Sequence, residues 1–116
     1  MADTKWAKVH TLLSSELRAS TGYSNAINAG EYAEAVFYLD VTTKEGTDPK
    51  LDLTLELSPD NITWFTSAVV FAQSVTEVKR LLAVASGLGM FVRFAYAVTG
   101  TNTPKFTFSL KGAFKS

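Results

Sequence analysis

Apolar and polar residues alternate along several stretches of this chain, and this alternation limits the possible folds more than any other feature of the sequence. It is cleanest at residues 51–57, where every second residue is leucine and the residues between are polar. Side chains of a β-strand point alternately to opposite faces, so the pattern predicts a strand with one buried and one solvated face. Residues 33–41 alternate in the same way. We interpret residues 44–49, which include Gly, Asp and Pro, as the turn between these two strands.

Further segments extend this pattern along most of the chain. Strands are expected at residues 9–17, 62–67, 68–72, 78–85, 90–98 and 105–111. We interpret residues 100–104, which include Gly and Pro, as the turn between the last two of these strands. The strand at 90–98 is apolar on both faces, which is typical of a central strand. The apolar residues at 75, 78, 82 and 85 also fit a helical spacing, but we favour a strand at 78–85 because the neighbouring segments are strands and a glycine-containing loop follows. Seven or eight short strands predict an all-β fold, an antiparallel two-sheet β-sandwich of jelly-roll or immunoglobulin-like kind.

The N-terminal third differs from the rest of the chain. After the strand at 9–17, residues Ala19–Gly30 are mostly small and polar, which is typical of a long loop or an extended arm. We therefore divide the chain into an N-terminal segment, residues 1–30, with one strand and this irregular arm or loop, and a sandwich body, residues 31–116. A length of 116 residues is typical of a single domain overall.

Composition narrows the function classes. Eleven Lys and Arg residues balance eleven Asp and Glu residues, and this balance does not favour binding to the phosphates of nucleic acid. The chain has no cysteine, which excludes disulfides, thiolate nucleophiles and Cys-ligated zinc. Residues 1–8 lack the apolar run of a signal peptide, and polar residues interrupt the apolar stretch at 81–98. We expect a soluble protein, made in a cytoplasm, that binds neither nucleic acid nor membrane.

Few residues have the chemistry of a catalytic or metal site. His10 is the only histidine, and we interpret it as a partly exposed strand residue. Asp40 and Asp52 could face one another across a hairpin, where they would bind calcium or form the carboxylate pair of a glycosidase. Solvated strand faces explain these acidic residues better. The sequence thus predicts no enzyme activity, no cofactor and no metal.

The segment from Ser58 to Trp64 is the most specific local motif. Asp60 and the asparagine after it suit a tight turn, Ser58 can cap that turn, and Trp64 can pack behind it. Turns of this type resemble those of discoidin-like carbohydrate-binding modules and the aspartate boxes of sialidases, with Asn61 standing where glycine is common. We interpret Ser58, Asp60 and Trp64 as a structural turn, with a ligand site as the alternative.

Four residues are candidates for contact with a partner protein. Trp6, Tyr23 and Tyr32 lie in the irregular N-terminal third, where an aromatic side chain can either anchor in a partner's pocket or cover the open end of the sandwich. Arg93 lies within an apolar strand, so its guanidinium needs a partner. That partner is either an acidic residue at the edge of the core or a group across a subunit interface.

Three stretches of the chain carry a resemblance to a known class of proteins, namely Leu51–Trp64, Gly89–Gly100 and Pro104–Lys115. Together they resemble small β-sandwich structural proteins of tailed bacteriophages, some of which are head decoration or cement proteins and others neck or tail components. The resemblance implies a non-catalytic protein of the virion that binds the major capsid protein or other virion proteins, as a homo-oligomer such as a dimer or trimer. The alternative from another class is a carbohydrate-binding β-sandwich module.

Overall fold

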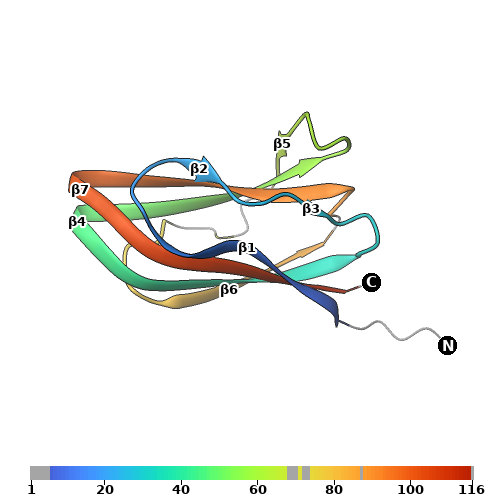
Figure 1. The fold of residues 1–116 in the computed structure, drawn as a ribbon, viewed down its shortest axis with the longest axis horizontal. Helices are drawn as coiled ribbons and strands as arrows, with labels where there is room; N and C mark the ends of the chain where they lie inside the picture. The colour runs from blue at the N-terminus through green and yellow to red at the C-terminus, as the bar shows by residue number, and fades with distance from the viewer. Residues whose placement is uncertain (1–5, 68–70, 72–73, 87, 116) are drawn as a thin grey trace.

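The chain folds into two layers of antiparallel β-strands (Figure 1). The structure is a computed structural model that describes residues 6–67, 71, 74–86 and 88–115, with the side chains of residues 6 and 7 left out of the description. No helix occurs among these residues. The predicted all-β, antiparallel sandwich is therefore confirmed.

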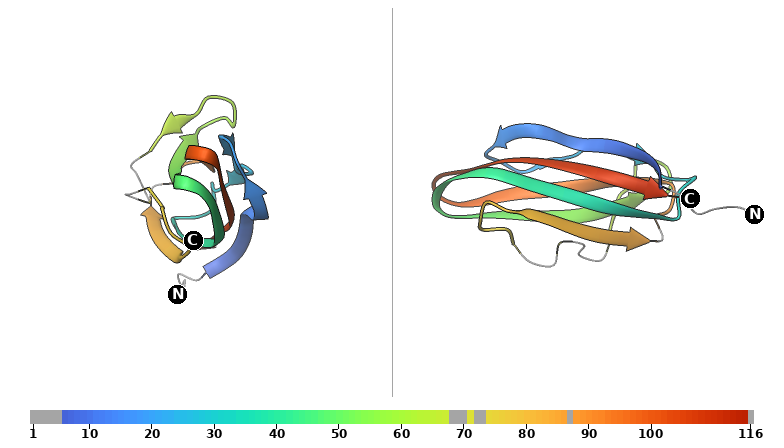
Figure 2. Two further views of the ribbon diagram at one scale, coloured as in Figure 1. Left: turned by 90° about the vertical axis from the view of Figure 1, so that its left-hand side faces the viewer. Right: turned by 90° about the horizontal axis from the view of Figure 1, so that it is seen from below.

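Two very long strands connect the layers. Strands β4 (Glu34–Ser58) and β7 (Phe91–Lys115) have 25 residues each and pair antiparallel along nearly their whole length. Both bend at the same place, as the right-hand view of Figure 2 shows. The first half of β4 therefore pairs with the second half of β7 in one layer, and their remaining halves pair in the other.

The bend explains where the sequence-based interpretation was wrong. Residues 44–49 and 100–104 were expected to separate consecutive strands, yet both strands continue through them. The pairing register shifts three times between residues 41 and 50, and such bulges sharpen a bend. Gly46 and Gly100 have φ of +99° and +137°, and a Cβ at Gly46 would lie 2.8 Å from the Cα of Pro104. Glycine is required there, so the corner turns the strand into the other layer instead of ending it.

Shorter strands complete each layer. The first layer contains β1 (Trp6–Arg18), the second half of β7, the first half of β4, and β6 (Arg80–Ser86). The second layer contains β2 (Gly22–Tyr23) and β3 (Ile27–Asn28), which pair with β7, and β5 (Phe65–Thr66), which pairs with β4. The strand predicted at 78–85 is confirmed as β6. The strand predicted at 62–67 shrinks to β5, and most of the one at 68–72 lies outside the described residues.

The segment Ala19–Gly30 is not an arm that extends from the body. It runs along the edge of the second layer, where Ser24, Ile27 and Ala29 are buried. The backbone N–H of Ser24 donates to the carbonyl of Phe94 at 2.8 Å, and the Ser24 hydroxyl accepts from the Phe94 N–H at 2.9 Å. Small side chains and a buried hydroxyl allow this close approach to β7. The prediction of a long loop or an extended arm rested on the small and polar residues of the segment, which do not show whether it packs against the body.

Aromatic side chains join the two layers. Phe37 of the first layer meets Phe94 of the second with ring centroids 4.8 Å apart and planes at 80°, and it also meets Phe114 at 5.9 Å. Such edge-to-face pairs add to the stabilisation from apolar burial. The largest fully buried side chains include Phe37, Phe94, Phe106, Phe108, Phe114, Leu12, Leu39 and Leu51.

Truncating Phe37 tests this core. The Phe37→Ala variant should lose about 3–5 kcal/mol of unfolding free energy, because a fully buried aromatic leaves a cavity between the layers. Chemical denaturation measures the change. The matched control is Tyr38→Ala on the opposite face of the same strand, which should cost less than about 1 kcal/mol. Similar losses in the two variants would contradict the assignment of inner and outer faces.

Candidate interaction surface

The outer face of the first layer carries a continuous apolar surface. Directly opposed residues of antiparallel strands point to the same face. The register places Val84, Val36, Ala113 and Val9 in one row across four strands. Val9 and Val84 are 63% and 60% exposed.

A second row enlarges this surface. Tyr38 lies opposite Leu82 on one side and Lys111 on the other, and Leu82 is 64% exposed. A groove of about 440 Å³ follows this row, lined in part by Tyr38, Leu82, Arg80, Asp40, Ser109 and Lys111. We call the following residues the outer patch: Val9, Val36, Tyr38, Leu82, Val84 and Ala113.

Charged residues border the outer patch. The Arg80 guanidinium lies 3.4 Å from the Asp40 carboxylate, and the Arg80 side chain is largely exposed whereas that of Asp40 is partly exposed. An exposed pair of this kind contributes little to folding stability. It places polar groups at the rim of an apolar surface, which is the arrangement found in protein interfaces.

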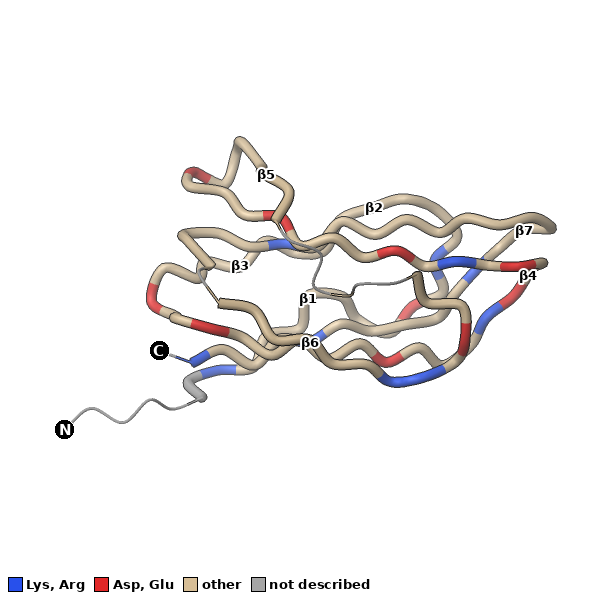
Figure 3. Tube along the Cα trace, turned by 180° about the vertical axis from the view of Figure 1, so that it is seen from behind, with Lys and Arg blue, Asp and Glu red and all other residues tan. Residues whose placement is uncertain are grey.

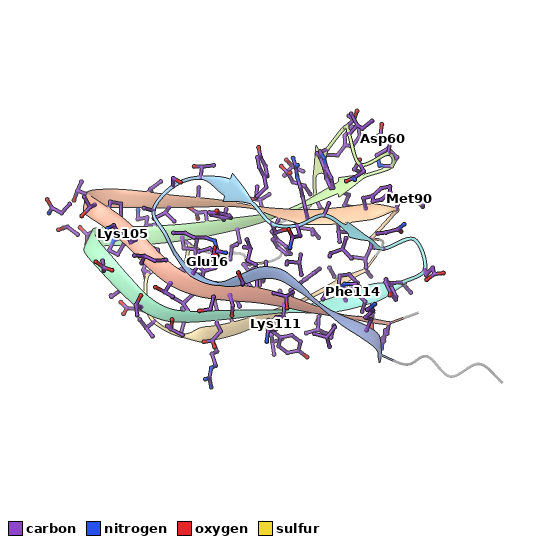
Figure 4. The ribbon with its side chains drawn as sticks, in the orientation of Figure 1. Glu16, Asp60, Met90, Lys105, Lys111 and Phe114 are labelled. Atoms are coloured by element: carbon purple, nitrogen blue, oxygen red, sulfur yellow. The ribbon has the colours of Figure 1, made fainter. Side chains whose placement is uncertain are left out.

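The turn after β4 projects from the body of the sandwich, with Asp60 near its tip (Figure 4). The Ser58 hydroxyl accepts the backbone N–H groups of Asp60 and Asn61 at 3.2 and 2.8 Å. The Asp60 carboxylate accepts those of Ile62 and Thr63 at 2.9 and 2.8 Å. Asn61 has a φ of 63°, which asparagine tolerates. These bonds rigidify the turn, and Ile62 stands 81% exposed on it.

The Asp60 carboxylate provides a pH test of this turn. Hydrogen bonds from the backbone of Thr63 and Ile62, and from the Ser58 hydroxyl, lower the pKa of Asp60 below its ordinary value of 3.8. The turn is therefore stabilised fully above pH 3.8 and loses this stabilisation as the pH falls through the lowered pKa. In an NMR titration, the amide shifts of Ile62 and Thr63 should change with a midpoint below 3.8. Asp60→Asn should abolish that transition, and a midpoint at or above 3.8 would contradict the geometry.

Arg93 is the centre of a cluster on the outer face of the second layer. Its Nε donates to Oε1 of Glu56 at 2.7 Å, and these two side chains are only 21% and 16% exposed. The guanidinium carbon lies 4.0 Å from the ring centroid of Tyr23 and 4.2 Å from that of Trp64. A guanidinium between two rings satisfies its charge through both the carboxylate and the aromatic faces.

This cluster brings together residues that are far apart in the sequence and that were considered there as unrelated candidates. Tyr23, Trp64 and Arg93 come from three distant segments, and their side chains meet only because β7 carries Arg93 between β2 and the end of the projecting turn. Sequence reasoning missed Glu56, which lies directly opposite Arg93 on β4. An acidic residue on one apolar strand and a basic residue on another suggest an ion pair, but the sequence does not reveal the register that places these two opposite each other. The guanidinium also covers one face of the Trp64 ring, which a stacked sugar would need.

Substituting Arg93 tests the cluster. Arg93→Ala should cost about 1–3 kcal/mol, because Glu56 loses its partner while partly buried. Arg93→Lys should recover only part of this, since an ammonium keeps the ion pair but lacks the planar stack. In a Trp6→Phe background, Trp64 fluorescence should shift to longer wavelength in Arg93→Ala. Full recovery by lysine would contradict the stacking contribution.

The remaining aromatic candidates lie at one end of the sandwich. The Tyr32 ring lies 5.3 Å from Phe114 and 6.5 Å from His10, between centroids, so it covers the edge of the core. Burial and the charge of Lys8 lower the pKa of His10. Trp6 begins β1 opposite Lys115, and its side chain lies outside the described residues.

The two candidate carboxylates lie in different layers of the fold. Asp40 belongs to the first layer, beside Arg80, whereas Asp52 belongs to the second and accepts a hydrogen bond from Ser74. The interpretation that they face one another across a hairpin is wrong, because β4 is one continuous strand that changes layers between them. Within the described ranges, no group of three or more His, Cys, Asp and Glu side chains could hold a metal ion.

In the described part of the chain, no helix is long and apolar enough to cross a membrane.

Comparison with known proteins relates the fold to viral and prophage structures. No protein family and no curated protein matches the sequence. The structure is similar to that of the SPBc2 prophage-derived protein YomS, with a TM-score of 0.55 and 11% identity over 94% of this chain and 92% of that one. It is also similar to a chain in the structure of infectious bursal disease virus, Gx strain, with a TM-score of 0.60 and 12% identity over 93% of this chain and 31% of the viral chain.

A third solved structure aligns less closely. The CBM22-1 xylan-binding domain of Paenibacillus barcinonensis Xyn10C gives a TM-score of 0.47 and 13% identity over 97% of this chain and 84% of that one. At such low identities, the two closer structures establish a shared β fold. Within that limit, this chain shares its fold with a prophage-derived protein and with part of a viral chain.

Proposed function

We propose that this protein is a non-catalytic structural component of a bacteriophage virion, a capsid decoration or cement protein that binds the major capsid protein. It acts by covering and joining subunits of the capsid lattice, and it is located in the assembled phage particle. No reaction is assigned to it.

The outer patch is the observation that carries this proposal. Its residues form an exposed apolar surface across four strands of a well-packed layer, with charged residues at the rim. Exposed contiguous apolar surface of this kind marks sites of protein association. The four strands that carry it pair with one another along the layer, so binding would require little ordering of the backbone and lose little entropy.

Two further observations support the virion assignment. The likeness in fold to the prophage-derived protein YomS extends over nearly the full length of both chains. The chain also has a formal net charge of zero, so copies placed side by side on a lattice repel each other little. On such a lattice, many modest contacts add through avidity, which makes a very tight single site unnecessary.

A neck or tail component is the closest alternative. The same surface could bind a portal, connector or tail subunit, so the choice depends on the number of copies in a particle. Quantitative mass spectrometry of purified particles should give on the order of hundreds of copies for a protein bound throughout a capsid lattice. A number near that of a single ring would assign the protein to the neck or tail, and absence from particles would refute the virion role.

Charge substitutions in the outer patch test the binding surface. The double variant Val9→Lys with Tyr38→Glu should reduce the copies bound per particle by roughly tenfold or more, since each charge must be desolvated on docking. Its melting temperature should stay close to that of the wild type, because both side chains are exposed. The matched control is Ile62→Lys, which places a charge on an exposed apolar residue of the projecting turn. Loss of binding in the control alone would move the contact to the turn and overturn the assignment to the outer patch.

A further inference from the structure

Strand β6 is an exposed edge without the usual protection against pairing. Its register with β4 is regular from Arg80 to Ser86, it contains no proline or glycine, and its only charged residue is the first one, Arg80. Figure 3 shows how Lys, Arg, Asp and Glu are distributed over the strands. Natural proteins usually protect a long edge with charges, bulges or brevity.

The other described edges do have such protection. Strand β1, at the opposite side of the same layer, has three register shifts and carries Lys8, Glu16 and Arg18. Strands β2, β3 and β5 at the margins of the second layer have two residues each. Among the described strands, β6 is thus the long, regular and nearly uncharged edge.

The hydrogen-bond pattern shows which backbone groups point outward from β6. The N–H of Val41 donates to the carbonyl of Lys79 at 2.9 Å, in line with the register of β4 and β6. Bonded pairs alternate along an antiparallel ladder, so residues 81, 83 and 85 bond to β4. The N–H and C=O groups of residues 80, 82, 84 and 86 therefore point to the free edge. Within the described chain, β6 pairs with β4 alone.

We propose that β6 pairs antiparallel with β6 of a second copy of this chain, with Ala83 at the twofold axis. Leu82 of one copy then lies opposite Val84 of the other, and Arg80 lies opposite Ser86. All four are residues whose peptide groups point outward, so the two copies form about eight backbone hydrogen bonds, one donated by each of these residues in each copy. The first layers join into one eight-stranded sheet.

A second copy fits this edge better than an unrelated strand because the edge is complementary to itself. The only charge, Arg80, meets a neutral serine and not a second arginine. Exposed apolar side chains meet each other, and Ala83, one of the two alanines of the strand, lies at the axis, where its small side chain permits close approach of the two copies. The two outer patches also become one continuous surface across the joined sheet.

The size of the edge sets the expected affinity. Seven residues span about 23 Å of strand, and such a contact buries less than the roughly 1,200 Å² of standard stable interfaces. We therefore expect a weak dimer, with a dissociation constant on the order of micromolar to hundreds of micromolar. Sedimentation velocity of the purified protein at increasing concentration should show monomer and dimer in rapid exchange. This proposal stands apart from the virion role, because it needs only the isolated chain.

A proline at the edge provides the first test. Val84→Pro removes an N–H that points away from β4, so the β4–β6 ladder keeps its bonds while the dimer loses two of its own. This variant should remain monomeric at every concentration at which the wild type dimerises. Val84→Thr, which keeps the N–H and the branched shape, is the matched control and should still dimerise.

Paired charge substitutions test the register of the dimer, and this test remains informative even if the proline variant does not fold. With Leu82→Lys and Val84→Glu in one chain, each new charge lies opposite its complement in the other copy, so the dimer should persist and weaken with salt. With Leu82→Lys and Val84→Lys, four like charges are opposed and the dimer should be lost. Equal behaviour of the two double variants would overturn the proposed register. A wild type that stays monomeric at millimolar concentration, or a dimer unaffected by Val84→Pro, would overturn the proposal itself.

Discussion

The pairing of β4 with β7 is the interaction on which the rest of this structure depends. Two strands of 25 residues pair along nearly their whole length and then bend together, so a single ladder supplies the centre of both layers. Every other described strand attaches to one of these two. A ladder that continues through the corner fixes how the layers sit on each other, because neither half can shift without breaking the pairing at the bend.

This architecture concentrates the exposed chemistry in two places. The first layer presents apolar side chains outward across four strands, whereas the second layer uses its outer face for the Arg93 cluster, in which charge and aromatic rings satisfy each other. A satisfied cluster stabilises the fold but has little remaining capacity to bind a partner. The apolar surface of the first layer is exposed, so the favourable free energy of removing it from water is gained when a partner binds there. For this reason, the proposed contacts lie on the first layer and at its β6 edge.

Much of the fold could be predicted from residue patterns. The alternation at 33–41, 51–57 and 105–111 gave the correct inner and outer faces, since side-chain direction in a strand depends only on position along it. The turn residues at 44–49 and 100–104 were also in the right places. Their structural role was predicted wrongly, because a glycine at positive φ can end a strand or bend it, and local sequence does not distinguish the two outcomes.

What the sequence determined by itself was therefore local: an all-β chain, the direction of each strand residue, and the residues able to form the Ser58–Asp60 turn. The tertiary structure decided which strands are neighbours. Only the register of β7 on β4 brings Glu56 to Arg93, places Asp40 and Asp52 in separate layers, and aligns Val9 with Val84 in one surface. The physical reason is that β pairing joins distant residues through backbone groups that nearly all residues share. The sequence of one strand therefore does not identify the strand with which it pairs.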